Sequence, residues 1–435
     1  MGGELPGTLL GSPPDREEGH IRRLFVDITP LREFREYRLL FSGFAISQLG
    51  RQLTVVAAPI QVFEMTGSTV AVGLLGLAQF PMLLIGSLVG GVLADSVDRR
   101  SLMIVSQVVM ALLASGLAIN AMFPDPAIWP VYVLTSGIAG MSGIDSPTRS
   151  AAIPRLVGAG HLQTALSLQH ALFQLSAVVG PGIAALLILR VNLASAFWVD
   201  AISFGAALAA LLMMKPMVPK HRVSPRETSI LEGFRFLRGR QSLQGVYLVD
   251  LNAMIFGTPR ALFPEFGTGV FGGNAATVAM LYAAPGVGAL IGALLSGWVA
   301  KIRRAGRAVL IAVGVWGVAV VAFGISSSLN VALVALAVAG AADVISAVFR
   351  GTILQLSVPD RLRGRLSAIQ IAVVAGGPRL GDAEAGAVAG LWGVRVSAWS
   401  GGMACLVGLA AIAARMPGFR DWQRPDDQAE VEYEV

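Results

Sequence analysis

The sequence predicts an all-α integral membrane protein whose twelve transmembrane helices form two six-helix, pseudo-symmetric halves. The first observation behind this is composition: of 435 residues, 54% are hydrophobic and only 14% are charged, and the mean hydropathy is +0.68. Soluble domains carry about 25% charged residues. The second is the series of long apolar runs, each near the roughly 20 residues that a spanning helix needs. The third is that glycines, prolines and arginines of the first half recur in the second.

The first half, residues 39–214, follows a polar segment, 1–38, and contains six apolar runs joined by short loops. Between the fourth and fifth runs we expect a basic loop over residues 149–161, because its bases interrupt the apolar pattern. The predicted spans cover residues 39–63, 70–94, 102–123, 128–148, 162–189 and 193–214.

The composition changes after residue 214, where residues 215–242 form a polar, basic connector. Within it, residues 230–237 have apolar side chains at helical spacing, which predicts a short amphipathic helix on the membrane surface. The second half, 243–416, precedes a charged tail, 417–435, that we expect to be disordered from Phe419 onward. The predicted spans of this half cover residues 243–266, 275–300, 308–326, 329–349, 366–391 and 396–415.

The basic residues lie in alternate loops, which sets the orientation. Arginines crowd the predicted cytoplasmic segments, whereas the loops near Thr66, Asp125, Gly272 and Ser327 carry almost none. The positive-inside rule therefore places both termini and the connector in the cytoplasm. The polar N-terminus does not have the pattern of a signal peptide.

The two halves repeat at an offset of about 200 residues. Arg149 recurs as Arg350, and the pair Gly180-Pro181 recurs as Gly377-Pro378. A duplicated bundle whose halves enclose a site at the middle of the membrane is the architecture of many secondary transporters. The alternative, that all apolar helices resemble one another, explains these matches poorly because they are glycines, prolines and arginines rather than leucines.

The short loop between the second and third spans carries the most specific motif. It reads Gly-Gly-Val-Leu-Ala-Asp-Ser-Val-Asp-Arg-Arg over residues 90–100. This resembles the G-x-L-A-D-R-x-G-R-R/K loop of the major facilitator superfamily, although Ser96 and Asp98 replace a base and a glycine of that pattern. The resemblance implies that the acid of this motif, Asp95, controls the conformational equilibrium by engaging the start of helix 11, near residues 363–366. The matching gate residues are Gly91, Asp95, Arg99 and Arg100.

Within that superfamily the chain is most similar to the branch of enterobactin exporters and drug-efflux proteins. The likeness covers nearly the whole chain and includes Pro-Arg-Ala-Leu-Phe-Pro at 259–264 and Arg-Leu-Arg-Gly-Arg-Leu-Ser at 361–367. The resemblance also implies an export motif in helix 5, kept here as Gly180, Pro181 and Gly182. A glycine-proline pair lets such a helix bend or pack closely, although an ordinary kinked helix would have the same pair.

Charged side chains inside the spans are the candidate functional groups, because each costs about 2.5–3.5 kcal/mol or more in the membrane. We expect them to face a cavity or a partner, and a buried carboxyl can exchange a proton as access alternates. The alternative is a structural ion pair with Arg51, Arg260 or Arg379. The proton-coupling candidates are Asp343, Glu384, Asp382 and Asp250, and the substrate-cavity candidates are Arg51, Arg260 and Arg379.

Asp343 is the first choice for the proton site, since the small residues around it leave room for a cavity. Arg350 lies two turns away, which predicts that any cation contacting Asp343 comes from another helix, with Arg51 and Arg260 as candidates. Four other charged residues lie nearer the predicted helix ends, where we expect them to extend to the headgroups. These are Asp145, Asp200, Glu265 and Arg350.

Together these features predict a proton-coupled exporter of small amphipathic or hydrophobic compounds, such as a siderophore or drug, in the bacterial inner membrane. The same fold also allows a proton-driven importer, or a receptor or scaffold that does not transport. The sequence lacks a phosphate-binding loop, and it has one cysteine and four histidines without ligand spacing. We therefore expect no enzyme activity, no cofactor and no metal. The expected partners are a small molecule, protons and lipid, but no nucleic acid, with the protein acting as a monomer.

Overall fold

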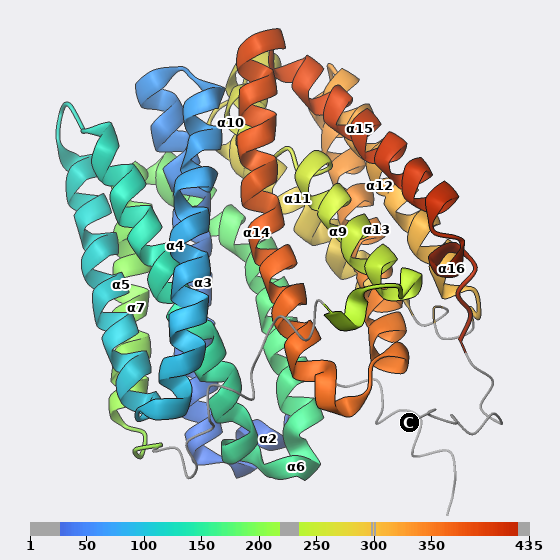
Figure 1. Ribbon diagram of the computed structural model, residues 1–435. Coiled ribbons are helices and arrows are strands. Elements are labelled where there is room, and N and C mark those ends of the chain that lie inside the picture. The colour runs from blue at the N-terminus through green and yellow to red at the C-terminus, as the bar shows by residue number, and fades with distance from the viewer. Residues whose placement is uncertain (1–26, 218–234, 297–298, 300–301, 425–435) are drawn as a thin grey trace, which may run out of the picture.

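A computed structural model describes residues 27–217, 235–296, 299 and 302–424, and Figure 1 shows its arrangement. In the described part of the chain the regular elements are helices. Eight of these helices are long and apolar enough to cross a membrane. The predicted N-terminal segment to residue 26, the connector over 218–234 and the tail from residue 425 lie outside the described residues, as does most of the amphipathic helix predicted at 230–237.

The first group of helices, which we call the N-terminal bundle, packs around α6. A short helix, α2 (Thr29–Glu33), precedes it and lies against α3 and α6. Within the bundle, α7 packs on α3 and α5, while α6 contacts α3, α4 and α5. Its members are α3 (Arg35–Thr66), α4 (Thr69–Ser96), α5 (Arg99–Met122), α6 (Ile128–Arg190) and α7 (Leu193–Leu212).

The second group, the C-terminal bundle, repeats much of this packing. Here α13 packs on α11 and α12, and α14 packs on α9 and α15. Its long helices are α9 (Gln241–Phe256), α11 (Ala275–Leu294), α12 (Ala305–Ile325), α13 (Leu329–Ser357), α14 (Asp360–Trp392) and α15 (Val394–Arg415).

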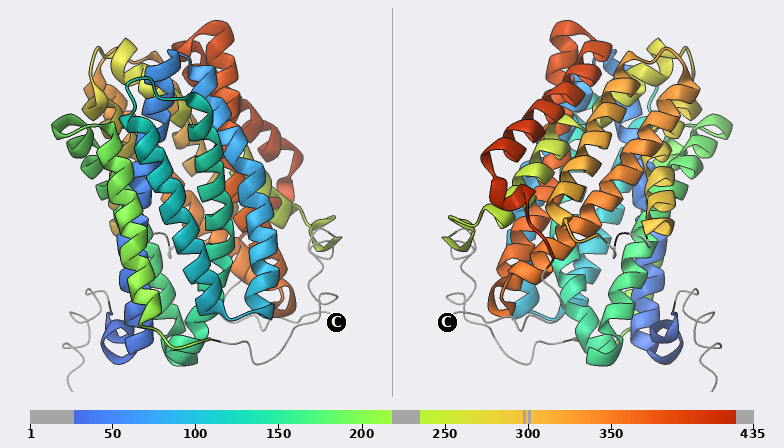
Figure 2. Two further views of the ribbon diagram at one scale, coloured as in Figure 1. Left: turned by 90° about the vertical axis from the view of Figure 1, so that its left-hand side faces the viewer. Right: turned by 90° about the vertical axis from the view of Figure 1, so that its right-hand side faces the viewer.

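Two helix pairs hold the bundles together. The helices α4 and α14 run side by side across the front of Figure 1, and α11 packs against α6. Glycines permit the first contact: the Gly386 Cα lies against Gly73, and a side chain at Gly76 would meet Asp382. Small residues allow helices to approach this closely in membranes. The side views in Figure 2 show the same two groups of helices.

The predicted loop over residues 149–161 is wrong, because α6 is helical on both sides of a single turn point. Only Gly158 has non-helical angles (φ 69°, ψ 173°) between Ile128 and Arg190. A positive φ of this kind is inexpensive only for glycine. The interruption therefore takes one residue, and the bases around it are carried on helical turns.

The predicted span over residues 243–266 is also not one helix. It ends at Phe256 and resumes as a 3-10 turn, η3 (Arg260–Leu262), followed by α10 (Phe263–Glu265) and a π-helical turn, η4 (Phe266–Val270). Pro259 cannot donate to a helical ladder and disfavours a helical residue before it. The break interrupts the helical hydrogen bonds over residues 257–259, which are buried within the bundle.

The tail prediction is wrong for its first part. A short helix, α16 (Pro417–Arg420), follows α15, and Phe419 is completely buried against α9. The Gly418 N–H donates to Gln241 Oε1 at 2.9 Å, and Arg307 pairs with Asp421 at 2.9 Å. One aromatic anchor and these polar contacts order the chain to at least residue 424.

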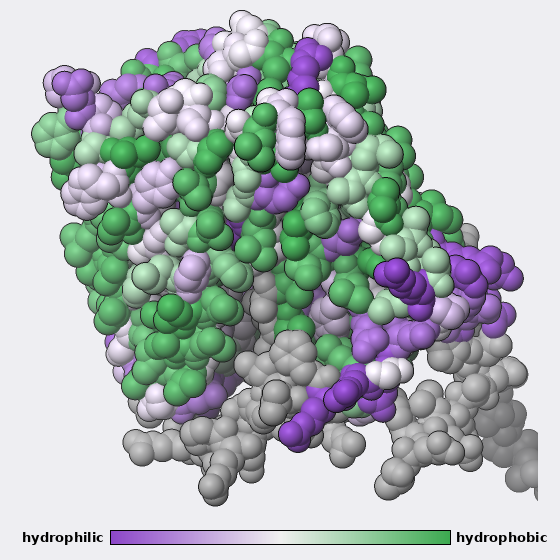
Figure 3. Space-filling view, turned by 45° about the horizontal axis from the view of Figure 1, so that its top comes forward, coloured by the Kyte–Doolittle hydropathy of each residue, from purple (hydrophilic) through white to green (hydrophobic). Residues whose placement is uncertain are grey.

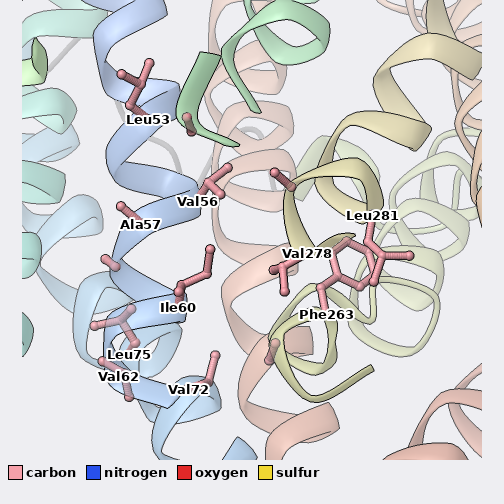
Figure 4. Packing of buried hydrophobic residues seen from close by; sticks show 14 of the residues in the cluster. Leu53, Val56, Ala57, Ile60, Val62, Val72, Leu75, Phe263, Val278 and Leu281 are labelled. Carbon is pink, nitrogen blue, oxygen red and sulfur yellow. The ribbon is translucent and has the colours of Figure 1, made fainter. Parts of the chain in front are cut away.

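Among the side chains that the structure describes, the buried apolar core is continuous across the bundles towards one end. Near Thr69 and α10, a cluster that we call the seal joins α3 to α10 and α11, and Figure 4 shows its side chains facing one another. Towards the other end, the buried clusters that the described side chains form lie within one bundle each. Apolar side chains cover much of the outer flank in Figure 3. The seal includes Leu53, Val56, Ile60, Phe263, Val278 and Leu281.

Candidate functional site

The break between α9 and η3 forms one wall of a pocket inside the C-terminal bundle. Asp343 from α13 and Arg260 from η3 supply its charged groups, and Thr258 lies at the break itself. Trp316 Nε1 donates to the Gly257 carbonyl at 2.9 Å, which satisfies one backbone group freed by the break. The remaining walls are mostly apolar and include Met254, Phe263, Pro285, Val320 and Leu336. The pocket thus combines an apolar surface with one acid and one base.

Asp343 belongs to a cluster of charges that the sequence did not predict. Its carboxylate lies 3.5 Å from Arg350 Nη2, and Arg350 Nη1 lies 2.9 Å from Asp250 Oδ1. The prediction that Arg350 is too far along the helix to reach Asp343 is therefore wrong. Two helical turns separate their backbones, but a long arginine side chain spans that distance. Arg260, one of the two predicted partners, lines the same pocket as Asp343.

Arg51, the other predicted partner, lies in the N-terminal bundle. Its guanidinium donates to Ser142 Oγ and, at 2.8 Å, to Gln48 Oε1. These neutral acceptors come from α6 and from one turn earlier on α3. In this structure Arg51 is therefore held by its own bundle and does not contact Asp343.

The last two acidic candidates, Asp382 and Glu384, lie two residues apart on α14. Asp382 accepts a hydrogen bond from the Ala261 N–H at 3.0 Å, and the bases that act on it electrostatically are Arg260 and Arg379. Glu384, two residues further on, is partly buried. Asp382 and Glu384 thus lie on the helix that contacts α4, whereas Asp343 lies in the pocket.

Three of the four charged residues expected at helix ends are buried. Asp145, Asp200 and Arg350 are at most 6% exposed, so that expectation is wrong. Asp145 pairs with Arg149 one turn along α6, and Asp200 accepts from the Thr54 hydroxyl of α3. Asp200 can be recognised as a buried, hydrogen-bonded acid only from the packing of α7 on α3, because its own helix carries no base that could pair with it.

Glu265, the fourth, joins the two bundles beside the seal. It accepts a hydrogen bond from the Thr69 hydroxyl, which is the first residue of α4. It is therefore partnered across the bundles instead of extending to the headgroups.

The predicted gate loop lies at the end of α4 opposite Thr69. The Asp95 side chain is 45% exposed and lies 3.5 Å from Arg99. Arg99 also donates to the Ala151 carbonyl, and Arg100 donates to the Leu211 and Leu212 carbonyls. The two arginines thus tie the start of α5 to α6 and α7. The predicted docking site of Asp95 is the start of α14, and the side chains of residues 360–365 there are not among those that the structure describes.

The predicted helix-5 motif lies within α6 where that helix passes α3. A side chain at Gly180 would collide with Gln52, whereas one at Gly182 would meet open space. The backbone stays helical through Pro181. Gly180 therefore serves close packing between α6 and α3.

Groups of three or more metal-ligating side chains do not occur among the described residues. The charged clusters mix carboxylates with arginines, a combination suited to ion pairing and proton exchange.

Comparisons with known proteins agree over most of the chain. The family described as transmembrane secretion effector, a group of major facilitator proteins, matches residues 26–433. The enterobactin exporter EntS of Shigella boydii serotype 18 is 29% identical over 385 residues, covering 88% of this chain and 92% of that protein. The same figures hold for EntS of Escherichia coli O139:H28.

Solved transporters share the fold at low sequence identity. A POT family transporter in complex with 5-aminolevulinic acid superimposes with a TM-score of 0.70 at 13% identity, covering 89% of this chain and 97% of that chain. An inward-facing bacterial homologue of the human lysosomal transporter Spinster gives a TM-score of 0.67 at 14% identity, covering 88% and 95%.

Proposed function

This chain belongs to the transmembrane secretion effector family of major facilitator transporters, and on that premise we propose that it exports an enterobactin-like siderophore in exchange for protons. It is a multi-pass membrane protein and a secondary transporter. The proposed movement is the rocking of residues 39–214 against residues 243–416. The relatives named as enterobactin exporters support the direction and the substrate.

The observation that carries the proposal is the pocket at the broken helix. Apolar walls from Phe263 and Trp316 suit the ring of an amphipathic compound, and Arg260 suits an acidic or hydroxyl group on it. Asp343 lies in the same pocket with 37% of its side chain exposed. Substrate and proton can therefore compete for one set of charges. Arg51 and Arg379 are further candidates for the substrate cavity.

We assign proton exchange first to Asp343. It is the acid that both lines the pocket and touches an arginine, so its partners can change as the bundles move. Asp250 is fully buried behind Arg350, and Asp382 is bonded to the backbone of η3. These two and Glu384 are the alternatives if Asp343 does not carry the proton.

The seal supports an inward-facing state. With the termini in the cytoplasm, the closed end that bears Thr69 and Glu265 is periplasmic and the Asp95 loop is cytoplasmic. The exposed Asp95 side chain then belongs to the open cytoplasmic side. We propose that Asp95 docks on the start of α14, whose N-terminus attracts an anion, when that side closes.

The test is uptake of radiolabelled enterobactin into inside-out vesicles under an imposed proton gradient. The wild-type protein should accumulate it, because inward movement in these vesicles corresponds to export from the cell. Asp343→Asn should abolish gradient-driven accumulation and retain part of the energy-independent exchange. Asp421→Asn, which changes an acid paired on the surface tail, is the matched control and should transport normally.

Each other outcome has a definite meaning. Accumulation only in right-side-out vesicles would identify an importer, and binding without flux in either orientation would identify a receptor. Normal accumulation in Asp343→Asn would show that another acid carries the proton, with Glu384, Asp382 and Asp250 as the candidates. For Asp95→Asn we expect reduced flux with affinity unchanged within a few-fold, so a large loss of affinity at normal turnover would contradict its role as a gate.

A further inference from the structure

We propose that Arg350 is a positioning residue that transmits the charge state of Asp343 to the contact between the two bundles. The proposal rests on the proposed function only in treating Asp343 as a group that gains and loses a proton. Arg350 is not itself among the residues that line the pocket. It acts through the two carboxylates on either side of it.

The geometry places one arginine between an accessible acid and a sealed one. Arg350 is itself 5% exposed, between Asp343 at 37% and Asp250 at 0%. The distances are 3.5 Å to Asp343 and 2.9 Å to Asp250. A proton arriving from the pocket reaches Asp343, while the arginine can shift its contact towards Asp250.

The cluster has unused hydrogen-bonding capacity that allows such a shift. Among the described residues, Arg350 Nε and Nη1 lack an aligned acceptor, although Nη1 is within ion-pair distance of Asp250. The Ser346 hydroxyl, one turn earlier on α13, and Gln370 Oε1 are also buried without a partner. An arginine fixed by two bidentate carboxylates would leave no such alternatives. This one can change partners without leaving the cluster.

Asp250 connects the cluster to the helix that meets the other bundle. Gln370 on α14 donates to Asp250 Oδ2 at 2.9 Å. Further along α14, a side chain at Gly376 would collide with the Phe80 ring of α4. The route therefore runs from Asp343 on α13 through Arg350 to Asp250 on α9, then through Gln370 to α14 and across to α4.

The charges around Asp343 give this route a direction. Those that act on it are Arg350 on its own helix, Asp250 on α9 and Arg260 on η3. The other helices packed on α13 are α11 and α12. Their titratable side chains have other partners: the Tyr282 hydroxyl donates to the Arg260 carbonyl, and Arg307 pairs with Asp421. Ionised Asp343 shares Arg350 with Asp250. Neutral Asp343 leaves the guanidinium to Asp250, which tightens α13 on α9 and changes how Asp250 holds α14.

The experiment measures the distance between the bundles without any substrate. Spin labels at two exposed positions, Ser150→Cys on α6 and Leu356→Cys on α13, report the separation at the end opposite the seal. Cys405→Ser supplies a background without the native thiol. Pulsed electron paramagnetic resonance on the full chain in nanodiscs then gives the distance distribution at acidic, neutral and alkaline pH.

We expect the distribution to shift with pH in this background and to lose that shift in both Asp343→Asn and Arg350→Lys. The lysine keeps the charge but lacks the planar guanidinium, whose Nη1 and Nη2 each reach one of the two carboxylates. Gln370→Leu keeps both ion pairs and should reduce the shift. Arg149→Lys is the matched control, because Arg149 pairs with Asp145 on its own helix, α6. This variant should leave the pH-dependent shift in distance unchanged. Size-exclusion chromatography and thermal unfolding establish that each variant is folded.

A normal pH shift in folded Arg350→Lys would overturn the proposal, and so would a background protein that does not respond to pH. A full response in Gln370→Leu would overturn the route through α14. If the shift depends on Arg350 while the vesicles fail to transport enterobactin, the proposed substrate is wrong and the inference stands.

Discussion

The two bundles place an arginine at matching positions of the repeat and give it different partners. Arg149 pairs with Asp145 on its own helix and lies over the Phe44 ring, 4.1 Å from its centroid. Arg350 pairs with Asp250 on another helix and also with Asp343. An ion pair within one helix moves with that helix, whereas one between helices changes when they shift. The comparison is consistent with a structural role for the first arginine and supports the coupling role proposed for the second.

One scaffold contact is the same in both bundles, which makes that difference informative. The Tyr37 hydroxyl of α3 donates to the Ala165 carbonyl of α6 at 2.8 Å. The Tyr247 hydroxyl of α9 donates to the Leu366 carbonyl of α14 at 3.0 Å. These bonds join the first and fifth spans of each half in the same way. The two bundles therefore share this contact, whereas the partners of the matching arginines differ.

The largest effect should come from removing the C-terminal arginine. Arg350→Ala leaves Asp250 buried beside an empty space and removes the cation from Asp343, and breaking a buried pair costs about 3–5 kcal/mol. Arg149→Ala should cost less, because Arg149 pairs with one carboxylate whereas Arg350 pairs with two. Reversible unfolding in mixed detergent micelles measures both. Equal losses would show that the two arginines play equivalent structural roles.

A smaller effect should come from the helix crossings that the bundles share. A side chain at Gly86 of α4 would meet the Gly140 backbone of α6, and one at Gly288 of α11 would meet the Ala337 backbone of α13. Gly86→Val and Gly288→Val should each destabilise the protein by about 1–3 kcal/mol through overpacking.

Gly91 is the control for these crossings, because no atom lies within 4 Å of an added Cβ there. Gly91→Ala should therefore leave thermal unfolding nearly unchanged. A loss as large as that of Gly86→Val would mean that close packing does not explain the crossings.

The smallest effect should come from the caps of two corresponding helices. Asp98 caps α5 through the Ser101 N–H, whereas Arg304 at the start of α12 makes no side-chain cap. Asp98→Ala should cost about 1 kcal/mol, and Arg304→Ala should have no measurable effect on the cap. Thermal unfolding of both variants tests this, and equal changes would contradict it.

The contribution of Asp98 should also depend on pH. Burial alone would raise the pKa of Asp98, but hydrogen bonds from Ser101 and the Met217 N–H outweigh burial and hold the pKa below its ordinary value of 3.8. Its stabilisation is therefore present above that value and is lost as the pH falls through the lower pKa of the folded state. The difference between wild type and Asp98→Ala should shrink in strongly acidic buffer.

The sequence by itself determined the helical membrane class and the approximate position of the spans. Hydropathy is a sum over about 20 neighbouring residues, so it needs no knowledge of the fold. The prediction of 193–214 corresponds to Leu193–Leu212, and that of 396–415 to Val394–Arg415. The loop motif at Asp95 and the repeat were equally visible, because both are local patterns. The family that they indicated is the one to which the chain belongs.

Only the tertiary structure decided which charges meet. Asp200 is buried because Thr54 of α3 faces it, and Asp250 is paired because α13 brings Arg350 to α9. These contacts depend on how far each packed helix is rotated and how deep it lies. A change in rotation or depth moves a side chain by several ångströms but leaves the hydropathy of the sequence the same. Phe419 shows the same for the tail: its burial depends on a space beside Gly245 of α9 that lies far away in the sequence.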